Sequence, residues 1–114
     1  MTDKAKERFV RLTHEVLDSD PFVRLSPIAT RILILLTRRF NGYNNGKIPC
    51  SVREAARWAH CRPNTAMQKF KELDKSGLAT MTRKGRFVLV GESTTNSASR
   101  WRVNFLQDQP GDLA

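Results

Sequence analysis

The residues from Ser51 to Gly77 constrain the fold of this 114-residue chain more than any other stretch. Ser51 is a good N-cap, and Glu54 stands three residues later, where its side chain can reach back to the N–H group of the cap. Pro63 suits the first position of a second helix, because the N–H group that it lacks has no helical partner there. Gly77 can close that helix in a left-handed conformation. The stretch predicts two short helices joined by a tight turn at residues 60–62.

The second of these helices has two distinct faces. Ala66, Phe70 and Leu73 follow the i, i+4, i+7 spacing of a helix that packs on a core. The residues on and beside the opposite face are Asn64, Gln68, Lys71 and Lys75, flanked by Thr65 and Glu72. Amides can bind adenine through two hydrogen bonds, and lysines suit guanine edges or phosphates. This layout is typical of a DNA-reading helix-turn-helix, although each residue taken singly also suits a solvated polar face.

Runs with strand character follow the second helix. Leu78–Thr82 is one, Phe87–Val90 is another, and Ser99–Phe105 is a third in which apolar and basic residues alternate. The sequence leaves open whether Leu78–Thr82 pairs first with Phe87–Val90 or with the third run. In the second case residues 84–98 form a long wing.

Three basic residues lie near the tip of the expected hairpin. Arg83, Lys84 and Arg86 can reach a phosphate backbone from there, although such a cluster also suits a solvated turn. A helix-turn-helix followed at once by a basic β-hairpin is the plan of a winged helix. The expected fold class is therefore α+β, with about three main helices and a small antiparallel sheet.

The stretch NNGKIPCSVREAARWAHCRPNTAMQKFKELDKSGL resembles the small winged-helix proteins of phages, plasmids and bacterial chromosomes. It is more distantly similar to the DNA-binding domain of the GntR-type repressors. The resemblance covers residues 26–101, about two thirds of the chain, and implies a helix, a short strand, the helix pair and a wing. By position it implies that the reading helix begins near Arg62 and that Asn64, Thr65 and Gln68 contact bases. The family usually has a Ser or Thr cap where Arg62 stands, and uncapped N–H groups beside an arginine suit a phosphate.

The charge of the chain is concentrated in the same region. Lys and Arg outnumber Asp and Glu by 20 to 11, and residues 21–90 hold 14 basic and 3 acidic side chains. An excess that belongs to the folded motif is what a DNA footprint requires. The longest apolar run, Ile32–Leu36, has five residues, whereas spanning a bilayer takes roughly 20. With no signal-peptide pattern at the start, we expect a soluble, cytoplasmic protein.

The sequence gives no sign of a metal site, a cofactor or a catalytic centre. Cys50 and Cys61 are expected to be reduced, with Cys50 packing as a small hydrophobe beside Ser51. A zinc site needs about four ligands in paired spacing, which His60 and Cys61 do not supply. No Gly-rich phosphate loop, nucleophile elbow or carboxylate pair in an apolar stretch occurs, so we expect no enzyme.

The residues before the helix-turn-helix supply a scaffold. Ser26 caps and Pro27 opens a helix that runs to about Phe40. Its apolar stripe is wide enough to pack against two neighbours, which we expect to be the helix-turn-helix and the segment Phe9–Phe22. The stripe consists of Ile28, Ala29, Ile32, Leu33, Leu35, Leu36 and Phe40.

Shorter elements complete the scaffold. Within Phe9–Phe22, Thr13 and Asp20-Pro21 are expected to begin two single helical turns. A turn-rich loop, Asn41–Gly46, leads to a short strand, Lys47–Pro49, at the edge of the wing sheet, where a proline is tolerated. Tyr43 in that loop is expected to pack on the scaffold; contact with a phosphate backbone is the alternative.

We therefore expect a single domain over residues 1–105. It divides into a scaffold segment (1–25), the helix-turn-helix (51–77) and the wing strands (78–105), and the tail 106–114 is expected to be disordered. The expected function is sequence-specific binding of double-stranded DNA, in a small transcriptional regulator or in a replication or partition protein of a mobile element. The residues expected to contact DNA are Arg53, Arg62, Asn64, Thr65, Gln68, Lys71, Lys75, Arg83, Lys84 and Arg86.

The alternative is a winged helix that binds a protein, such as a phage-encoded inhibitor of a host machine. An apolar patch on the reading helix would favour it, and Met67 is the one residue there that hints at such a patch. A homodimer also stays open, and it would have to use the first 20 residues or the wide-striped helix.

Overall fold

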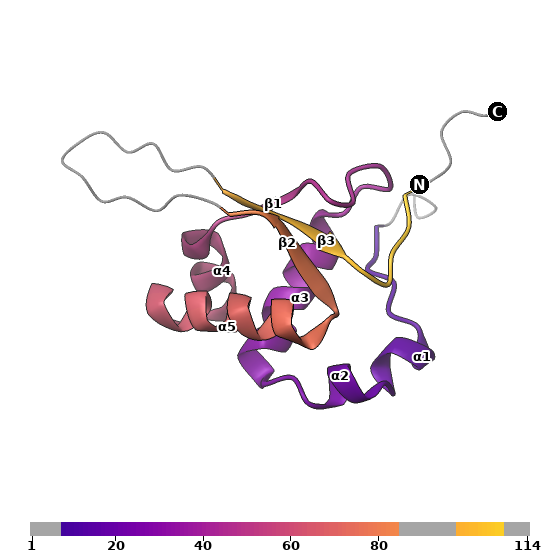
Figure 1. The fold of residues 1–114 in the computed structure, drawn as a ribbon, viewed down its shortest axis with the longest axis horizontal. Helices are drawn as coiled ribbons and strands as arrows, with labels where there is room; N and C mark the ends of the chain where they lie inside the picture. The colour runs from indigo at the N-terminus through magenta and orange to yellow at the C-terminus, as the bar shows by residue number, and fades with distance from the viewer. Residues whose placement is uncertain (1–7, 85–97, 109–114) are drawn as a thin grey trace, which may run out of the picture.

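The computed structural model describes residues 8–84 and 98–108, which form five helices and a three-stranded antiparallel sheet (Figure 1). This is the expected α+β class. The helices are α1 (His14–Leu17), α2 (Asp20–Val23), α3 (Pro27–Arg39), α4 (Val52–Ala59) and α5 (Pro63–Ser76). The strands are β1 (Ile48–Cys50), β2 (Ala79–Arg83) and β3 (Ser99–Val103).

Helix α3 forms where the sequence predicts it. The Oγ atom of Ser26 accepts a hydrogen bond from the backbone nitrogen of Ala29 at 3.3 Å, and Pro27 occupies the first position. The helix packs against α4 and α5, and also against β1 and β3. Its buried residues are Ala29, Ile32, Leu33, Leu35, Leu36 and Thr37.

The N-terminal segment covers α3 less than expected. Thr13 caps α1 through a hydrogen bond from Val16 (3.2 Å), and α2 begins at Asp20, both as predicted. However, α1 and α2 contain no buried residue, and Phe9 is 78% exposed. Phe22 packs against the core. The expectation that Phe9–Phe22 forms the second neighbour of α3 is therefore wrong for most of that segment. The further elements that contact α3 are β1 and β3.

Helices α4 and α5 form the predicted pair. Ser51 and Glu54 make a capping box, with two hydrogen bonds of 3.1 Å between side chain and backbone. His60 adopts a left-handed conformation (φ 57°, ψ 49°) and turns the chain between the helices. Arg62 precedes α5 without a capping side-chain hydrogen bond, and Gly77 closes α5 with φ 85°.

The sheet has the order β1-β3-β2. Trp101 on the central strand β3 pairs with Ile48 on β1 and with Met81 on β2. Among the described residues β2 pairs with β3, the third of the runs with strand character. The run Phe87–Val90 lies outside the described residues. β1 lies at an edge of the sheet, as predicted. Pro49 has no N–H group to donate, and an edge strand tolerates this.

The core lies between helices α3–α5 and one face of the sheet. The ring of Trp101 is fully buried and meets Phe70 of α5 edge to face, with ring centroids 5.0 Å apart. Val103 is also fully buried, whereas Arg100 and Arg102 point to solvent, as the alternation in the sequence predicts. This packing fixes α5 against the sheet.

One loop residue ties the end of β3 to the scaffold. The side-chain amide of Asn45 donates to the carbonyls of Val103 (3.0 Å) and Leu106 (2.9 Å), and its Oδ1 accepts from the Val103 nitrogen (2.8 Å). The Asn45 nitrogen donates to Asp108 at 2.8 Å. The segment up to Asp108 is therefore anchored, against the expectation of a disordered tail from residue 106, and residues 109–114 lie outside the described part.

Candidate nucleic-acid interface

The structure places the predicted amide and lysine face of α5 at the surface. Asn64, Gln68, Lys71 and Lys75 are all exposed. At 100° per residue the four span about 60° of the helix circumference, so they form one strip along α5. The residues of α5 that are buried against the core are Ala66, Phe70 and Leu73. The division of α5 into a packed and an exposed face is confirmed.

The two residues expected to flank this strip differ from it. Thr65 is half-buried. Glu72 accepts hydrogen bonds from the backbone nitrogen (2.8 Å) and the hydroxyl (2.9 Å) of Ser26, and Lys69 lies 3.3 Å from its carboxylate. Partial burial alone would raise the pKa of Glu72, but these hydrogen bonds and the nearby Lys69 lower it below its usual value. Glu72 therefore holds α5 against the start of α3 and takes no part in the exposed strip.

Two of the predicted arginines lie on the helix pair. Arg62 is exposed at the residue that precedes α5, where no side chain caps the first turn. The backbone N–H groups of a helix start carry partial positive charge, so this end of α5 suits an anion. Arg53 is exposed in the first turn of α4, which packs against α5.

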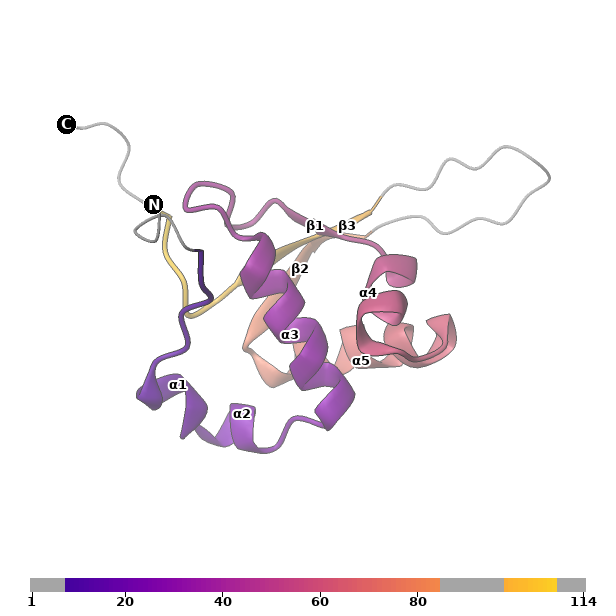
Figure 2. The same cartoon turned by 180° about the vertical axis from the view of Figure 1, so that it is seen from behind.

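The remaining predicted residues lie at the end of β2. Arg83 and Lys84 are exposed, whereas Arg86 lies outside the described residues. Both views of the fold show the ends of β2 and β3 that flank residues 85–97 on the same side of the molecule as α4 and the beginning of α5 (Figures 1 and 2). Arg83 and Lys84, at the end of β2, thus lie on the same side of the molecule as the start of α5.

Tyr43 does not join this group. It is 68% exposed, so the expectation that it packs on the scaffold is wrong. The loop 41–46 that carries it lies at the opposite side of the sheet from α5 in both views (Figures 1 and 2).

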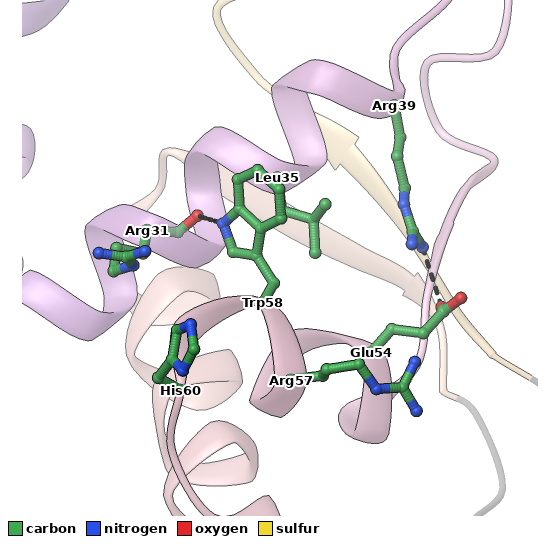
Figure 3. A pocket seen from close by; sticks show the side chains of 7 residues that line it. All are labelled: Arg31, Leu35, Arg39, Glu54, Arg57, Trp58 and His60. Atoms are coloured by element: carbon green, nitrogen blue, oxygen red, sulfur yellow. Dashed lines mark hydrogen bonds and ion pairs between the residues drawn. The ribbon is translucent and has the colours of Figure 1, made fainter.

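A groove between α3 and α4 is a feature that the sequence analysis missed. It encloses about 490 Å³ and holds Trp58, whose indole nitrogen donates to the carbonyl of Arg31 at 2.8 Å (Figure 3). Arg57 and His60 also line it. No periodic signal marks this groove, because a single Trp followed by Ala suits a core position as well as a surface one.

One ion pair closes an end of this groove. Nη1 of Arg39 lies 2.9 Å from Oε1 of Glu54. The hydrogen bond from Arg39 lowers the pKa of Glu54 below its usual value, because it favours the charged carboxylate. Glu54 thus serves both the capping box of α4 and the contact between α4 and α3.

Within residues 8–84 and 98–108, no group of three or more His, Cys, Asp and Glu side chains is placed to hold a metal ion. Burial raises the pKa of the Cys50 thiol to about 12, so Cys50 packs in the core as a neutral group. Among the described helices none has the length and apolar character needed to cross a bilayer.

No protein-family model, curated protein or solved structure matches the chain.

Proposed function

We propose that this chain is a winged helix-turn-helix protein that binds double-stranded DNA in a sequence-specific manner. The observation that carries the proposal is the exposed strip of α5. Asn64 and Gln68 stand one turn apart on a helix whose other side is locked into the core by Phe70. Amide side chains at such positions can make paired hydrogen bonds to adenine in the major groove, which is wide enough to admit a helix.

The basic residues around this strip account for affinity. Lys71 and Lys75 extend the strip, and Arg62 and Arg53 lie at the start of α5 and on α4. Arg83, Lys84 and Arg86 hold the flanking phosphate backbone from the wing. Contacts of this kind carry no sequence information, but they set the register of the reading helix and supply most of the salt-dependent binding energy.

The process served is transcriptional regulation or the replication or partition of a mobile element. The competing function, a winged helix that binds a host protein, has one observation in its favour. Met67 on α5 is 39% exposed, beside the polar strip. Four polar side chains against one partly exposed apolar side chain favour DNA as the ligand of α5.

Selection of bound duplexes from a random pool tests the proposal. The expected result is an enriched motif that the protein binds at least about 10³-fold more tightly than random duplexes at physiological salt. A pool that shows no enrichment after repeated rounds, with protein that is folded by circular dichroism, would overturn the proposal and favour the protein-binding alternative.

A further inference from the structure

The groove between α3 and α4 is built around a fixed tryptophan. Trp58 is 36% exposed although its only polar group, the indole N–H, is already bonded to Arg31. What the side chain offers to solvent is therefore apolar ring surface, held in one orientation. Tryptophan and arginine are among the side chains enriched at the positions that dominate binding between proteins.

The charges around this ring are mostly positive. Arg31 and Arg57 are exposed at the groove, and Figure 3 shows their guanidinium groups at its margins. The third arginine of the groove, Arg39, is paired with Glu54, the only carboxylate among the described residues that line it. The groove therefore suits an acidic ligand that also carries an apolar side chain to cover Trp58.

The chain itself contains a surface of this description. From residue 12 to residue 23 it has three acidic residues and no Lys or Arg, within a chain that carries 20 basic residues. Glu15 on α1, Asp18 at the C-cap of α1 and Asp20 on α2 are exposed and form no ion pair with another described residue. Leu17 and Val23 beside them are 37% and 66% exposed.

This acidic segment does not fill the groove of its own molecule. No residue from 12 to 23 lines the groove, and both views place α1 and α2 at a distance from α4 (Figures 1 and 2). The groove lies between α3 and α4, and Figures 1 and 2 show α3 and α5 nearest the viewer from opposite directions. A ligand on the exposed strip of α5 leaves the groove accessible.

We propose that the acidic segment of one copy docks in the Trp58 groove of a second copy. Contacts between two different surfaces of the same chain join copies head to tail. They form a closed pair when each copy also places its own acidic segment in the groove of the other. Because the contact is small and pairs opposite charges, the association is weak and falls as salt is raised. This association between copies does not require DNA binding.

Complementation between two variants tests the proposal. Arg57→Glu disables the groove, and Asp18→Lys with Asp20→Lys disables the acidic segment; all three residues are exposed, so the fold is expected to persist. Sedimentation equilibrium without DNA is expected to show that the wild type associates with a Kd below about 1 mM. Each variant alone is expected to stay monomeric. An equimolar mixture of the two variants is expected to form a dimer, because each supplies the half that the other lacks. Arg38→Glu, the same charge change on α3 outside the groove, is expected to associate like the wild type.

Iodide quenching of tryptophan fluorescence gives a second measurement. Trp101 is fully buried, so quenching reports on Trp58, and association is expected to reduce it. Three results would overturn the proposal: a wild type that stays monomeric, a variant mixture that does not dimerise, or protection of Trp58 by duplex DNA in a monomeric protein.

Discussion

The carboxylate of Glu72 on α5 accepts two hydrogen bonds from Ser26 at the start of α3, at 2.8 Å from its backbone nitrogen and 2.9 Å from its hydroxyl. In α4 the same role belongs to Glu54, three residues after its own cap Ser51. α3 has Ala29 at the corresponding position, so α5 supplies the carboxylate that the local sequence lacks. Glu72 thereby joins α5 to the start of α3.

Replacing Glu72 with alanine is expected to lower the free energy of unfolding by about 1–2 kcal/mol, because the two donors of Ser26 lose their acceptor. Urea denaturation followed by circular dichroism measures this change. Asp74→Ala removes an exposed carboxylate from the same helix and is expected to stay within about 0.5 kcal/mol of the wild type. Equal effects of the two substitutions would contradict the role of Glu72.

Phe70→Ala is expected to lower the free energy of unfolding by about 3–5 kcal/mol, since Phe70 is 2% exposed and packs on Trp101. A domain of this size has little stability beyond that amount, so a large unfolded fraction is expected at 25 °C. Phe9→Ala provides the control, because Phe9 is 78% exposed and its loss is expected to change the melting temperature little. If Phe70→Ala melted like the wild type but lost DNA binding, the packed and exposed faces of α5 would be exchanged.

Much of this fold could be predicted from the sequence, because it depends on local patterns. The capping box at Ser51 and Glu54, the left-handed Gly77 and the period of Phe70 and Leu73 are settled within one or two helical turns. The same period separates Gln68 from the core and needs no information on the neighbours of α5.

The features that escaped prediction depend on contacts between distant residues. Glu72 and Ser26 are 46 positions apart, so a helical wheel placed Glu72 beside the exposed strip and gave no hint of its partner. Asn45 binds Val103 over 58 positions, and nothing local marks it as an anchor. The exposure of Trp58 likewise follows from how α3 crosses α4, which the residues of α4 alone do not determine.

Glu54 is expected to contribute to the loss of stability at acidic pH. Its pKa in the folded protein lies below the ordinary 4.5, because Arg39 and Ser51 hydrogen-bond the carboxylate. The unfolded chain therefore binds the proton more tightly, so the stabilising contribution of Glu54 is complete above the ordinary pKa and is lost as the pH falls through the lower folded pKa. Glu54→Gln is expected to unfold at lower urea concentration at pH 7 and to lose less stability than the wild type between about pH 5 and pH 3.

Urea midpoints across that pH range measure this difference. Glu15→Gln, at an exposed position of α1, serves as the control and is expected to follow the wild-type curve. A Glu54→Gln curve parallel to that of the wild type would show that the capping and ion-pair contacts of Glu54 contribute nothing to the acid sensitivity.

Sequence discrimination is expected to depend on Gln68. Gln68→Ala is expected to weaken binding to the preferred duplex by about 1–3 kcal/mol and to leave binding to random duplexes nearly unchanged, because only base contacts distinguish the two. Fluorescence anisotropy with both duplexes measures the difference. Gln107→Ala, an exposed amide outside α5, is the matched control with no expected effect. Equal losses on both duplexes would assign Gln68 to the phosphate backbone.

The central claim is that the α5 strip reads sequence while the wing cations hold the backbone. The measurement that tests it most directly is affinity across a salt series, on selected and random duplexes, for the wild type and for a triple variant with alanine at Arg83, Lys84 and Arg86. A second triple variant, with alanine at the N-terminal Arg8, Arg11 and Arg24, controls for the loss of three positive charges away from the wing.

The wing variant is expected to bind both duplexes more weakly and to keep its preference for the selected one. Its slope of log affinity against log salt is expected to be smaller than that of the wild type by about 0.9 for each lost phosphate contact, since each contact releases counterions from the duplex. The control variant is expected to keep the wild-type slope. A wild type that shows no preference for any duplex at any salt concentration would contradict the account.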